Sequence, residues 1–174
     1  MLFVFKCIPE ATIPTYATAS SACFDVYACL PKDITVKCFV PFPCNPFASS
    51  EFNRTITIDD KQQFELPSGA RALIPTGLKF NIPSKHSVRL HPRSGLSFKS
   101  GVVLANCQGV IDEDYVEQVF VPLFNCSPCS VTITHGDRIC QGELVKDLAA
   151  AVVETHDEPT KKTDRSGGFG STGV

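Results

Sequence analysis

The chain has 174 residues, of which 43% are hydrophobic, and a formal net charge of −2 at pH 7. This length and apolar share fit one domain, or one domain with an insertion. The small negative charge argues against a surface that attracts nucleic acid or an anionic membrane. No apolar run approaches the roughly 20 residues of a membrane span, and we expect no signal peptide because the first apolar run is short.

Nine cysteines are scattered along the chain without a disulfide framework. Together with the expected absence of an export signal, they indicate free thiols in a reducing, cytoplasmic compartment. Cys126 and Cys129 form one C-x-x-C pair around a Ser-Pro turn dipeptide, and His135 is the only nearby further metal ligand. Because zinc needs more ligands than these, a turn is the better interpretation.

Short β-branched and aromatic runs alternate with proline and glycine along the whole chain, which is typical of an all-β barrel or jelly roll. The predicted strands are Leu2–Cys7, Phe24–Ala28, Asp33–Lys37, Thr55–Ile58, Ala70–Pro75, Leu78–Ile82, Ser87–His91, Val102–Leu104, Val119–Asn125, Ser130–Ile133 and Arg138–Val145. One short helix is expected after Pro92, through Leu96–Lys99, and it should end at Gly101.

Two segments differ in composition from the predicted barrel, residues 1–154. Cys38–Gln63 is rich in proline and phenylalanine at its start and then polar, so we interpret it as an insertion with a small hairpin around Asp59-Asp60. It either folds back onto the barrel or forms a surface for a protein partner. Residues 155–174 form a charged linker followed by a glycine-rich C-terminal arm.

Two segments of the first two thirds of the chain carry groups that suit a nucleotide. Ala22–Ala28 reads A-C-F-D-V-Y-A and places Asp25 in a strand pattern, where it needs either an ion-pair partner or a metal ion with its water. Pro92–Leu96 reads P-R-S-G-L, and a short helical turn with an arginine and a serine can bind an anion, although R-S-G is also an ordinary turn.

The segment Asn106–Tyr115 reads N-C-Q-G-V-I-D-E-D-Y. We expect a hairpin with its tip at Gly109, where backbone groups could pair with the edge of a base. Asp112 follows two β-branched residues, and a carboxylate held there could take a proton from water. The alternative for Asp112 is a turn-capping role.

Two further segments complete the set. Gly136–Gln141 is a turn that leads into a strand, and Gln141 could donate to a phosphate oxygen, while structural roles suit Asp137 and Arg138. Arg165–Gly173 reads R-S-G-G-F-G-S-T-G, which offers a guanidinium to phosphate and a ring to a base. The alternative is a glycine- and serine-rich disordered tail.

Taken in this order, the segments resemble the five motifs of the trimeric dUTPase family, and Arg71–Pro83 resembles its connecting strands. The resemblance implies a distorted jelly-roll β-barrel that assembles as a homotrimer, with sites between subunits. It implies hydrolysis of dUTP to dUMP and pyrophosphate with Mg²⁺, which limits uracil in DNA and supplies dUMP for dTMP synthesis.

The resemblance also implies a role for each matched position. Asp112 resembles the carboxylate that activates water, Tyr115 the ring beneath the deoxyribose, and Asp25 the acid that contacts Mg²⁺ through water. Asn106 and the backbone around Gly109–Ile111 resemble the uracil reader. The residues implied in substrate binding are Arg93, Ser94, Gly95, Asn106, Gly109, Val110, Ile111, Tyr115, Phe120, Gln141, Arg165, Phe169, Gly170, Ser171 and Thr172.

Three features depart from the family pattern. Val116-Glu117 replaces the usual Arg-Gly, Arg165 lies one residue closer to Phe169 than usual, and the insertion has no counterpart in the minimal pattern. Two alternatives to a plain dUTPase stay open. One is a dCTP deaminase-like enzyme, and the other is a dUTPase-like protein whose insertion mediates a regulatory protein–protein interaction.

Overall fold

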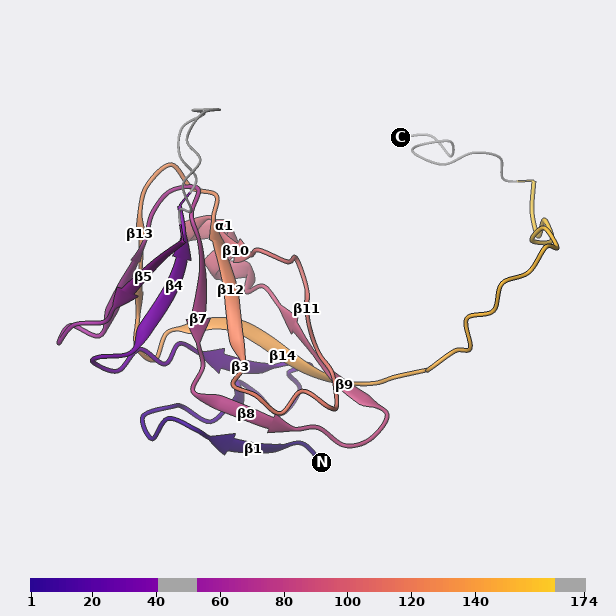
Figure 1. The fold of residues 1–174 in the computed structure, drawn as a ribbon, viewed down its shortest axis with the longest axis horizontal. Coiled ribbons are helices and arrows are strands. Elements are labelled where there is room, and N and C mark those ends of the chain that lie inside the picture. The colour runs from indigo at the N-terminus through magenta and orange to yellow at the C-terminus, as the bar shows by residue number, and fades with distance from the viewer. Residues whose placement is uncertain (41–52, 165–174) are drawn as a thin grey trace.

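The computed structural model describes residues 1–40 and 53–164. Two five-stranded sheets and two two-stranded sheets, all antiparallel, account for nearly all regular structure in these residues (Figure 1). The first large sheet has the order β10 (Val102–Leu104), β12 (Phe120–Asn125), β7 (Arg71–Pro75), β4 (Thr35–Phe39) and β5 (Asn53–Thr57). The second has the order β11 (Gly109–Ile111), β9 (His86–His91), β14 (Arg138–Lys146), β3 (Phe24–Tyr27) and β2 (Thr15–Tyr16).

The two small sheets add to this barrel. They pair β1 (Phe3–Lys6) with β8 (Leu78–Asn81), and β6 (Gln63–Leu66) with β13 (Val131–Thr134). The two large sheets enclose one apolar core. Its largest fully buried side chains are Phe64, Leu30, Ile58, Leu66, Ile74, Leu78, Leu123, Ile133, Ile139, Val26, Val36 and Val88. The all-β prediction is therefore confirmed.

Buried and exposed side chains alternate along the strands, so each strand turns one face to the core. In β4 the outward positions are Thr35 and Lys37, while Val36 and Cys38 are buried. A strand places successive side chains on opposite faces, so a period of two buries one face and solvates the other. The same alternation recurs in β6 and β7.

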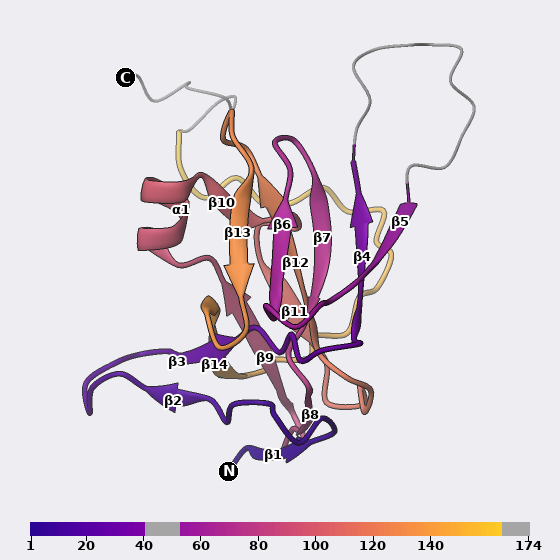
Figure 2. The ribbon, with the colours of Figure 1, turned by 90° about the vertical axis from the view of Figure 1, so that its left-hand side faces the viewer.

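The predicted short helix is confirmed as α1 (Ser94–Ser100), which lies next to β10 (Figure 2). Gly101 ends it with a left-handed φ of +65°, and its N–H donates to the carbonyls of Leu96 and Ser97. Glycine adopts this conformation without the steric cost that a Cβ brings, which is why the helix ends there.

Two predicted hairpins are wrong. Gly109 is the first residue of β11 and pairs with Leu90, and the turn lies earlier, around Cys107. Moreover, β10 pairs with β12 and β11 with β9, so the strands on either side of this turn belong to different sheets. The hairpin around Asp59-Asp60 also fails, because β5 pairs with β4 while β6 pairs with β13.

Part of the predicted insertion, Cys38–Gln63, belongs to the barrel. Both of its ends belong to the barrel: Cys38 is buried in β4, Ile58 is buried after β5, and Gln63 begins β6. The remaining part, residues 41–52, lies outside the described residues, so a protein partner for this segment stays a prediction.

Residues 148–164 follow β14, are exposed and contain no helix or strand (Figure 1). The boundary predicted between barrel and linker stays a prediction. Within the part of the chain that is described, no helix is both long and apolar enough to cross a membrane.

Phe24 packs directly over a glycine of the neighbouring strand. Its ring makes edge-on contacts with Tyr16 and Phe80, at centroid distances of 5.9 and 6.4 Å. Gly142 pairs with Phe24 across the ladder, and a Cβ on Gly142 would overlap the ring. The absence of a side chain at this position therefore lets the buried ring approach β14 closely.

We expect Gly142→Ala to lower the free energy of unfolding by about 1–3 kcal/mol, because a buried ring has to leave its packed position. Urea denaturation at a fixed protomer concentration measures the change. Gly95→Ala is the matched control, since a Cβ at Gly95 meets nothing within 4 Å and alanine favours a helix by up to about 1 kcal/mol. Equal stabilities for Gly142→Ala and wild type would contradict this packing argument.

Candidate functional site

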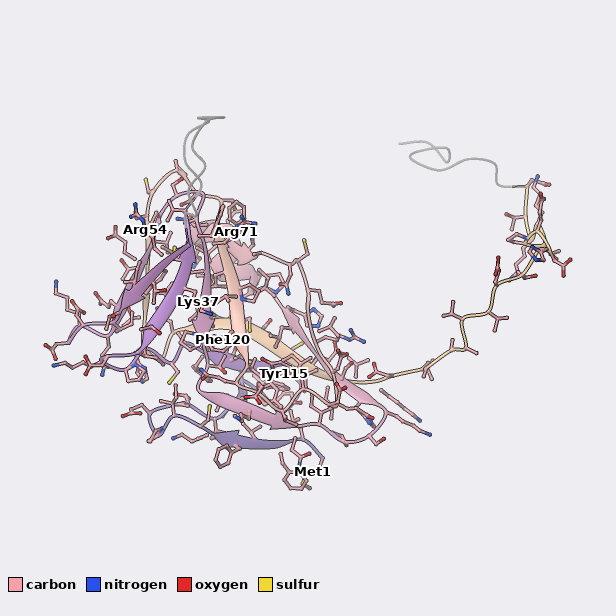
Figure 3. All side chains as sticks on the ribbon, viewed as in Figure 1. Met1, Lys37, Arg54, Arg71, Tyr115 and Phe120 are labelled. Carbon is pink, nitrogen blue, oxygen red and sulfur yellow. The ribbon has the colours of Figure 1, made fainter. Side chains whose placement is uncertain are left out.

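The end of β11 and the loop after it form a hollow of about 170 Å³. The residues that line it are Val110, Ile111, Asp112, Tyr115, Val119 and Phe120. All of these except Val119 belong to the site predicted from the sequence. Tyr115 and Phe120 lie on the same side of the barrel (Figure 3), so the structure brings this part of the predicted site together.

Three hydrogen bonds, which involve backbone and side-chain groups, fix the loop that carries Asp112. The N–H of Tyr115 donates to the carbonyl oxygen of Asp112 over 3.2 Å, and the hydroxyl of Tyr115 donates to the carbonyl of Gln118 over 2.9 Å. The carboxylate of the next residue, Glu113, accepts a hydrogen bond from the N–H of Lys85. These contacts position the exposed side chain of Asp112 at the hollow without using its carboxylate.

The unusual Glu117 of this loop has a cationic partner. Its carboxylate lies 3.3 Å from the ammonium of Lys79 on β8, and both side chains are solvent-accessible. An exposed pair of this kind adds little to stability. It does, however, offset the negative charge that Val116-Glu117 introduces beside the hollow.

A second group of predicted residues surrounds a buried carboxylate on β3, which belongs to the same large sheet as β11. Asp25 on β3 is 4% exposed, and its two oxygens lie 3.4 Å from Nε of Arg93 and 3.2 Å from Nη1 of Arg138. Nη1 of Arg93 also donates to the carbonyl oxygen of Arg138 over 3.0 Å. The ion pair that the sequence left open for Asp25 is therefore present.

Strand pairing places Gln141 beside this second group of residues. It pairs with Asp25 on one side and with His91 on the other, so its side chain lies on the same face as the carboxylate. The buried thiol of Cys140 lies behind this face, and burial, followed by the charge of Asp25, raises its pKa to about 12. This thiol thus stays protonated and adds no charge beside Asp25.

Ser94 and Gly95 are exposed in the first turn of α1, directly after Arg93. Asn106 is exposed in the turn that precedes β11. The predicted site residues Arg165, Phe169, Gly170, Ser171 and Thr172 lie outside the described residues. Sequence reasoning missed Val119 in the hollow and assigned Arg138 only a general structural role.

The hollow and the arginine cluster lie far apart within one chain. Ile111 pairs with Val88, so Asp112 follows at the level of Ser87 on β9, while Arg93 lies beyond the opposite end of that strand. At about 3.3 Å per extended residue, the six residues from Ser87 to Arg93 correspond to about 20 Å. One chain therefore does not bring its own Asp112 to its own Arg93.

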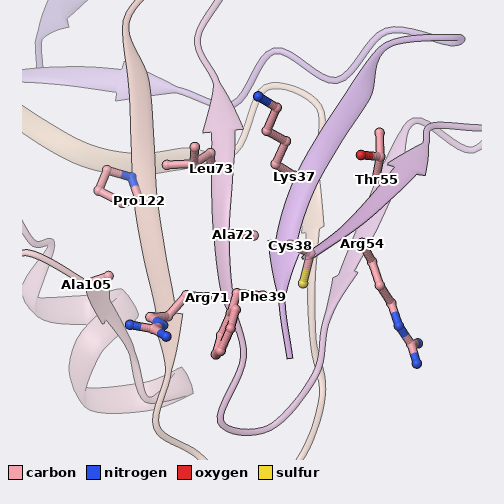
Figure 4. A pocket seen from close by; sticks show the side chains of 10 residues that line it. All are labelled: Lys37, Cys38, Phe39, Arg54, Thr55, Arg71, Ala72, Leu73, Ala105 and Pro122. Atoms are coloured by element: carbon pink, nitrogen blue, oxygen red, sulfur yellow. The ribbon is translucent and has the colours of Figure 1, made fainter. Parts of the chain in front are cut away.

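A larger hollow of about 480 Å³ lies on the outer face of β4, β5, β7 and β12. Arg71 covers the ring of Phe39 there at 4.4 Å from the centroid, and Lys37 and Arg54 lie nearby (Figure 4). None of the site residues predicted from the sequence lines it. Its size alone does not make it the functional site, because it holds no carboxylate and no residue of the five sequence segments.

Comparisons with known proteins match the chain to one family. A model of the dUTPase family matches residues 58–173. The deoxyuridine 5'-triphosphate nucleotidohydrolase of Caulobacter vibrioides is 36% identical over 166 residues, which cover 95% of this chain and 88% of that protein. The corresponding enzyme of Leptospira interrogans is 32% identical over 173 residues, with 99% of this chain and 98% of that protein covered.

Among solved structures, a point mutant of the Staphylococcus bacteriophage 80alpha dUTPase, with dUpNHpp, superposes with a TM-score of 0.75. The match covers 100% of this chain and 99% of that one at 18% identity, which supports the predicted jelly-roll fold. The chain therefore belongs to the dUTPase family, and it is a dUTP diphosphatase that hydrolyses dUTP to dUMP and pyrophosphate.

Proposed function

We propose that dUTP is cleaved in a site shared between protomers of a homotrimer. The hollow of one protomer supplies Asp112 and Tyr115, and a second protomer supplies Arg93 and Gln141. The observation that carries this proposal is the separation of about 20 Å between Asp112 and Arg93 along β9. A uracil nucleotide with three phosphates needs both groups, so the missing half comes from another copy of the chain.

Uracil recognition is assigned to the hollow and to the turn before it. Asn106 and the backbone of Gly109 and Val110 would pair with the edge of the base. Because a wrong base leaves buried polar groups unpaired, such pairing discriminates strongly. The ring of Tyr115 would lie beneath the deoxyribose, where a 2′-hydroxyl has no room, and the dUpNHpp bound to the related phage enzyme supports a nucleotide of this shape.

Asp112 would act as the general base. Its carboxylate takes a proton from water as the water attacks the triphosphate, and the bond that breaks joins the α- and β-phosphates because the products are dUMP and pyrophosphate. Arg93 would stabilise the charge that develops on the phosphates. Its Nε and Nη1 face Asp25 and Arg138, and Nη2 has no partner among the described residues.

The residues around Asp25 fit a Mg²⁺ ion only through water. Oδ1 of Asp25 is buried and accepts no hydrogen bond from the described residues, so a water molecule of hydrated Mg²⁺ could donate to it. Direct coordination is less suitable, because both oxygens already face guanidinium groups. When bound, Mg²⁺ would neutralise charge on the triphosphate. The C-terminal arm, Arg165 to Thr172, is proposed to close over the nucleotide.

We expect Asp112→Asn to keep dUTP binding but to lower turnover by roughly 10²–10⁴-fold, the size of a general-base contribution. Pyrophosphate release gives the rate, and calorimetric titration with a non-hydrolysable dUTP analogue gives the affinity. Asp114→Asn is the matched control, since it removes an exposed carboxylate from the same loop and should leave the rate within a few-fold of wild type. A fully active Asp112→Asn enzyme would assign the base elsewhere.

A mixing experiment tests the shared site. Asp112→Asn and Arg93→Ala protomers are each expected to be inactive alone, and equal amounts refolded together should regain about a quarter of wild-type turnover. The reason is that random assembly places an intact hollow against an intact Arg93 in about one site in four.

The control for this experiment mixes Asp112→Asn protomers with protomers that carry both substitutions. No intact pair of residues can form in that mixture, so activity should stay absent. If verified mixed oligomers of the test mixture recover no activity, each site is built from a single chain. Recovery in the control would show that the regained activity does not depend on Asp112.

A further inference from the structure

Three potential metal ligands converge on the polar face of the second large sheet. Sγ of Cys23, a ring nitrogen of His91 and a carboxylate oxygen of Glu143 all lie within 4.8 Å of one another, and all three residues are partly buried. Cys23 lies directly before β3, His91 at the end of β9 and Glu143 in the middle of β14. Pairing of three strands, rather than closeness in sequence, brings them together.

We propose that Cys23, His91 and Glu143 bind one Zn²⁺ ion, with water as the fourth ligand. A thiolate, an imidazole and a carboxylate form a donor set that suits zinc, whereas Mg²⁺ and Ca²⁺ prefer oxygen ligands alone. This site is therefore separate in its chemistry from the Mg²⁺ that accompanies the triphosphate, and it goes beyond dUTP hydrolysis.

The geometry of the cluster fits a tetrahedral ion. Zinc bonds of about 2.1 Å to nitrogen and oxygen, at a tetrahedral angle, separate these two atoms by about 3.4 Å. Nε2 of His91 and Oε2 of Glu143 are 3.3 Å apart, which is long for a direct hydrogen bond and close to that separation. Cys23 precedes β3, and its sulfur lies within 4.8 Å of both of these side chains.

The histidine also has an outer partner. Nδ1 of His91 lies 3.4 Å from the side-chain amide of Gln108, in the turn before β11. A metal-bound histidine commonly donates its second N–H to an oxygen acceptor, which fixes the orientation of the ring. With Zn²⁺ on Nε2 and the amide of Gln108 turned by 180°, Nδ1–H would donate to its oxygen. The ion would thereby connect three strands to the turn before β11.

The cluster lies beside the proposed phosphate site, so a bound ion would affect the residues of that site. Each ligand lies two residues along the chain from a residue of the proposed phosphate site. For Cys23 and Glu143, the residues two positions away are Asp25 and Gln141, which pair with each other across β3 and β14. Since alternate residues of a strand share a face, bound Zn²⁺ would hold these two strands in place directly beside the phosphate contacts.

The other cysteine and histidine residues considered for zinc are engaged differently. Nδ1 of His135 accepts a hydrogen bond from the N–H of Leu30 over 2.9 Å. Cys126 donates its thiol hydrogen to the carbonyl of Gly101. These residues, with Cys129, form no ligand cluster in the described part of the chain, and they provide controls for adventitious binding by thiols.

The test uses Co²⁺ as a spectroscopic substitute for Zn²⁺. The full-length protein is stripped with a chelator, kept reduced with a phosphine and titrated with Co²⁺ in the absence of nucleotide. We expect one Co²⁺ per chain, with a sulfur-to-cobalt charge-transfer band and visible bands of a tetrahedral site, both abolished by added Zn²⁺. Cys23→Ser should lose the charge-transfer band, and Gln108→Ala should bind about 10–100-fold more weakly, as for loss of an outer-shell partner.

Matched controls separate this site from other thiols. Cys107→Ser and Cys126→Ser each remove an exposed cysteine and should leave the spectrum and stoichiometry unchanged. Zn²⁺ should raise the melting temperature of these variants as it does that of wild type. The rise should be absent in Cys23→Ser and in Glu143→Gln, which retains the shape of the side chain.

Three results would overturn the proposal: no saturable binding by wild type, a charge-transfer band that persists in Cys23→Ser, or a band that disappears in Cys126→Ser. A variant that fails to fold is recognised from its melting curve without metal. If Cys23→Ser fails to fold, the loss of the Zn²⁺-dependent rise in melting temperature in Glu143→Gln tests the proposal instead. Metal binding is measured without nucleotide, so a failure to bind zinc leaves the proposed dUTP site unaffected. A failure of the proposed dUTP site would likewise not change the metal-binding result.

Discussion

The buried carboxylate of Asp25 is the group on which the polar side of the second sheet depends. It lies between two guanidinium groups and connects β3, the segment after β9 and the start of β14. Removing such charges from water is costly, so an ion pair of this kind is weak evidence for added stability. Its effect is positional: it fixes Arg93 at Nε, while the carbonyl of Arg138 fixes Nη1. The orientation of the main proposed phosphate contact thus follows from a residue that is almost inaccessible to solvent.

Sheet register then decides what a single chain can and cannot assemble. The pairing of β14 with both β3 and β9 places Gln141 beside Asp25 and His91. Because β11 pairs with β9 in the antiparallel sense, β11 ends beside the start of β9. Asp112 therefore lies far from Arg93, which follows the end of β9. Both arrangements follow from the same antiparallel strand β9. The topology therefore keeps Asp112 and Arg93 of one chain apart, and this separation is the reason for proposing a site shared between protomers.

The sequence predicted what is local and failed where partners are distant. Turn residues delimited most strands, and the left-handed Gly101 ended the helix as expected. The two-residue strand β2 is too short to show a period, and β6, which begins at the last residue of the supposed insertion, was not predicted as a strand. The hairpin at Gly109 failed for a different reason: a turn signal indicates that the chain reverses, but not which strands pair on each side. The pair Asp25–Arg138, which spans 113 residues, gave no local signal that fixed it.

The loop beside the hollow shows how a departure from a family pattern can be compensated elsewhere. Glu117 stands where a small, uncharged glycine is usual, and its carboxylate would repel a triphosphate if it were unpaired. Lys79 comes from β8, which pairs with the N-terminal strand β1, and its ammonium lies 3.3 Å from this carboxylate. An exposed pair contributes little to folding, so stability does not explain it. The pair instead balances the charge of Glu117, which lies outside the hollow, while Asp112 is the carboxylate among the residues that line it.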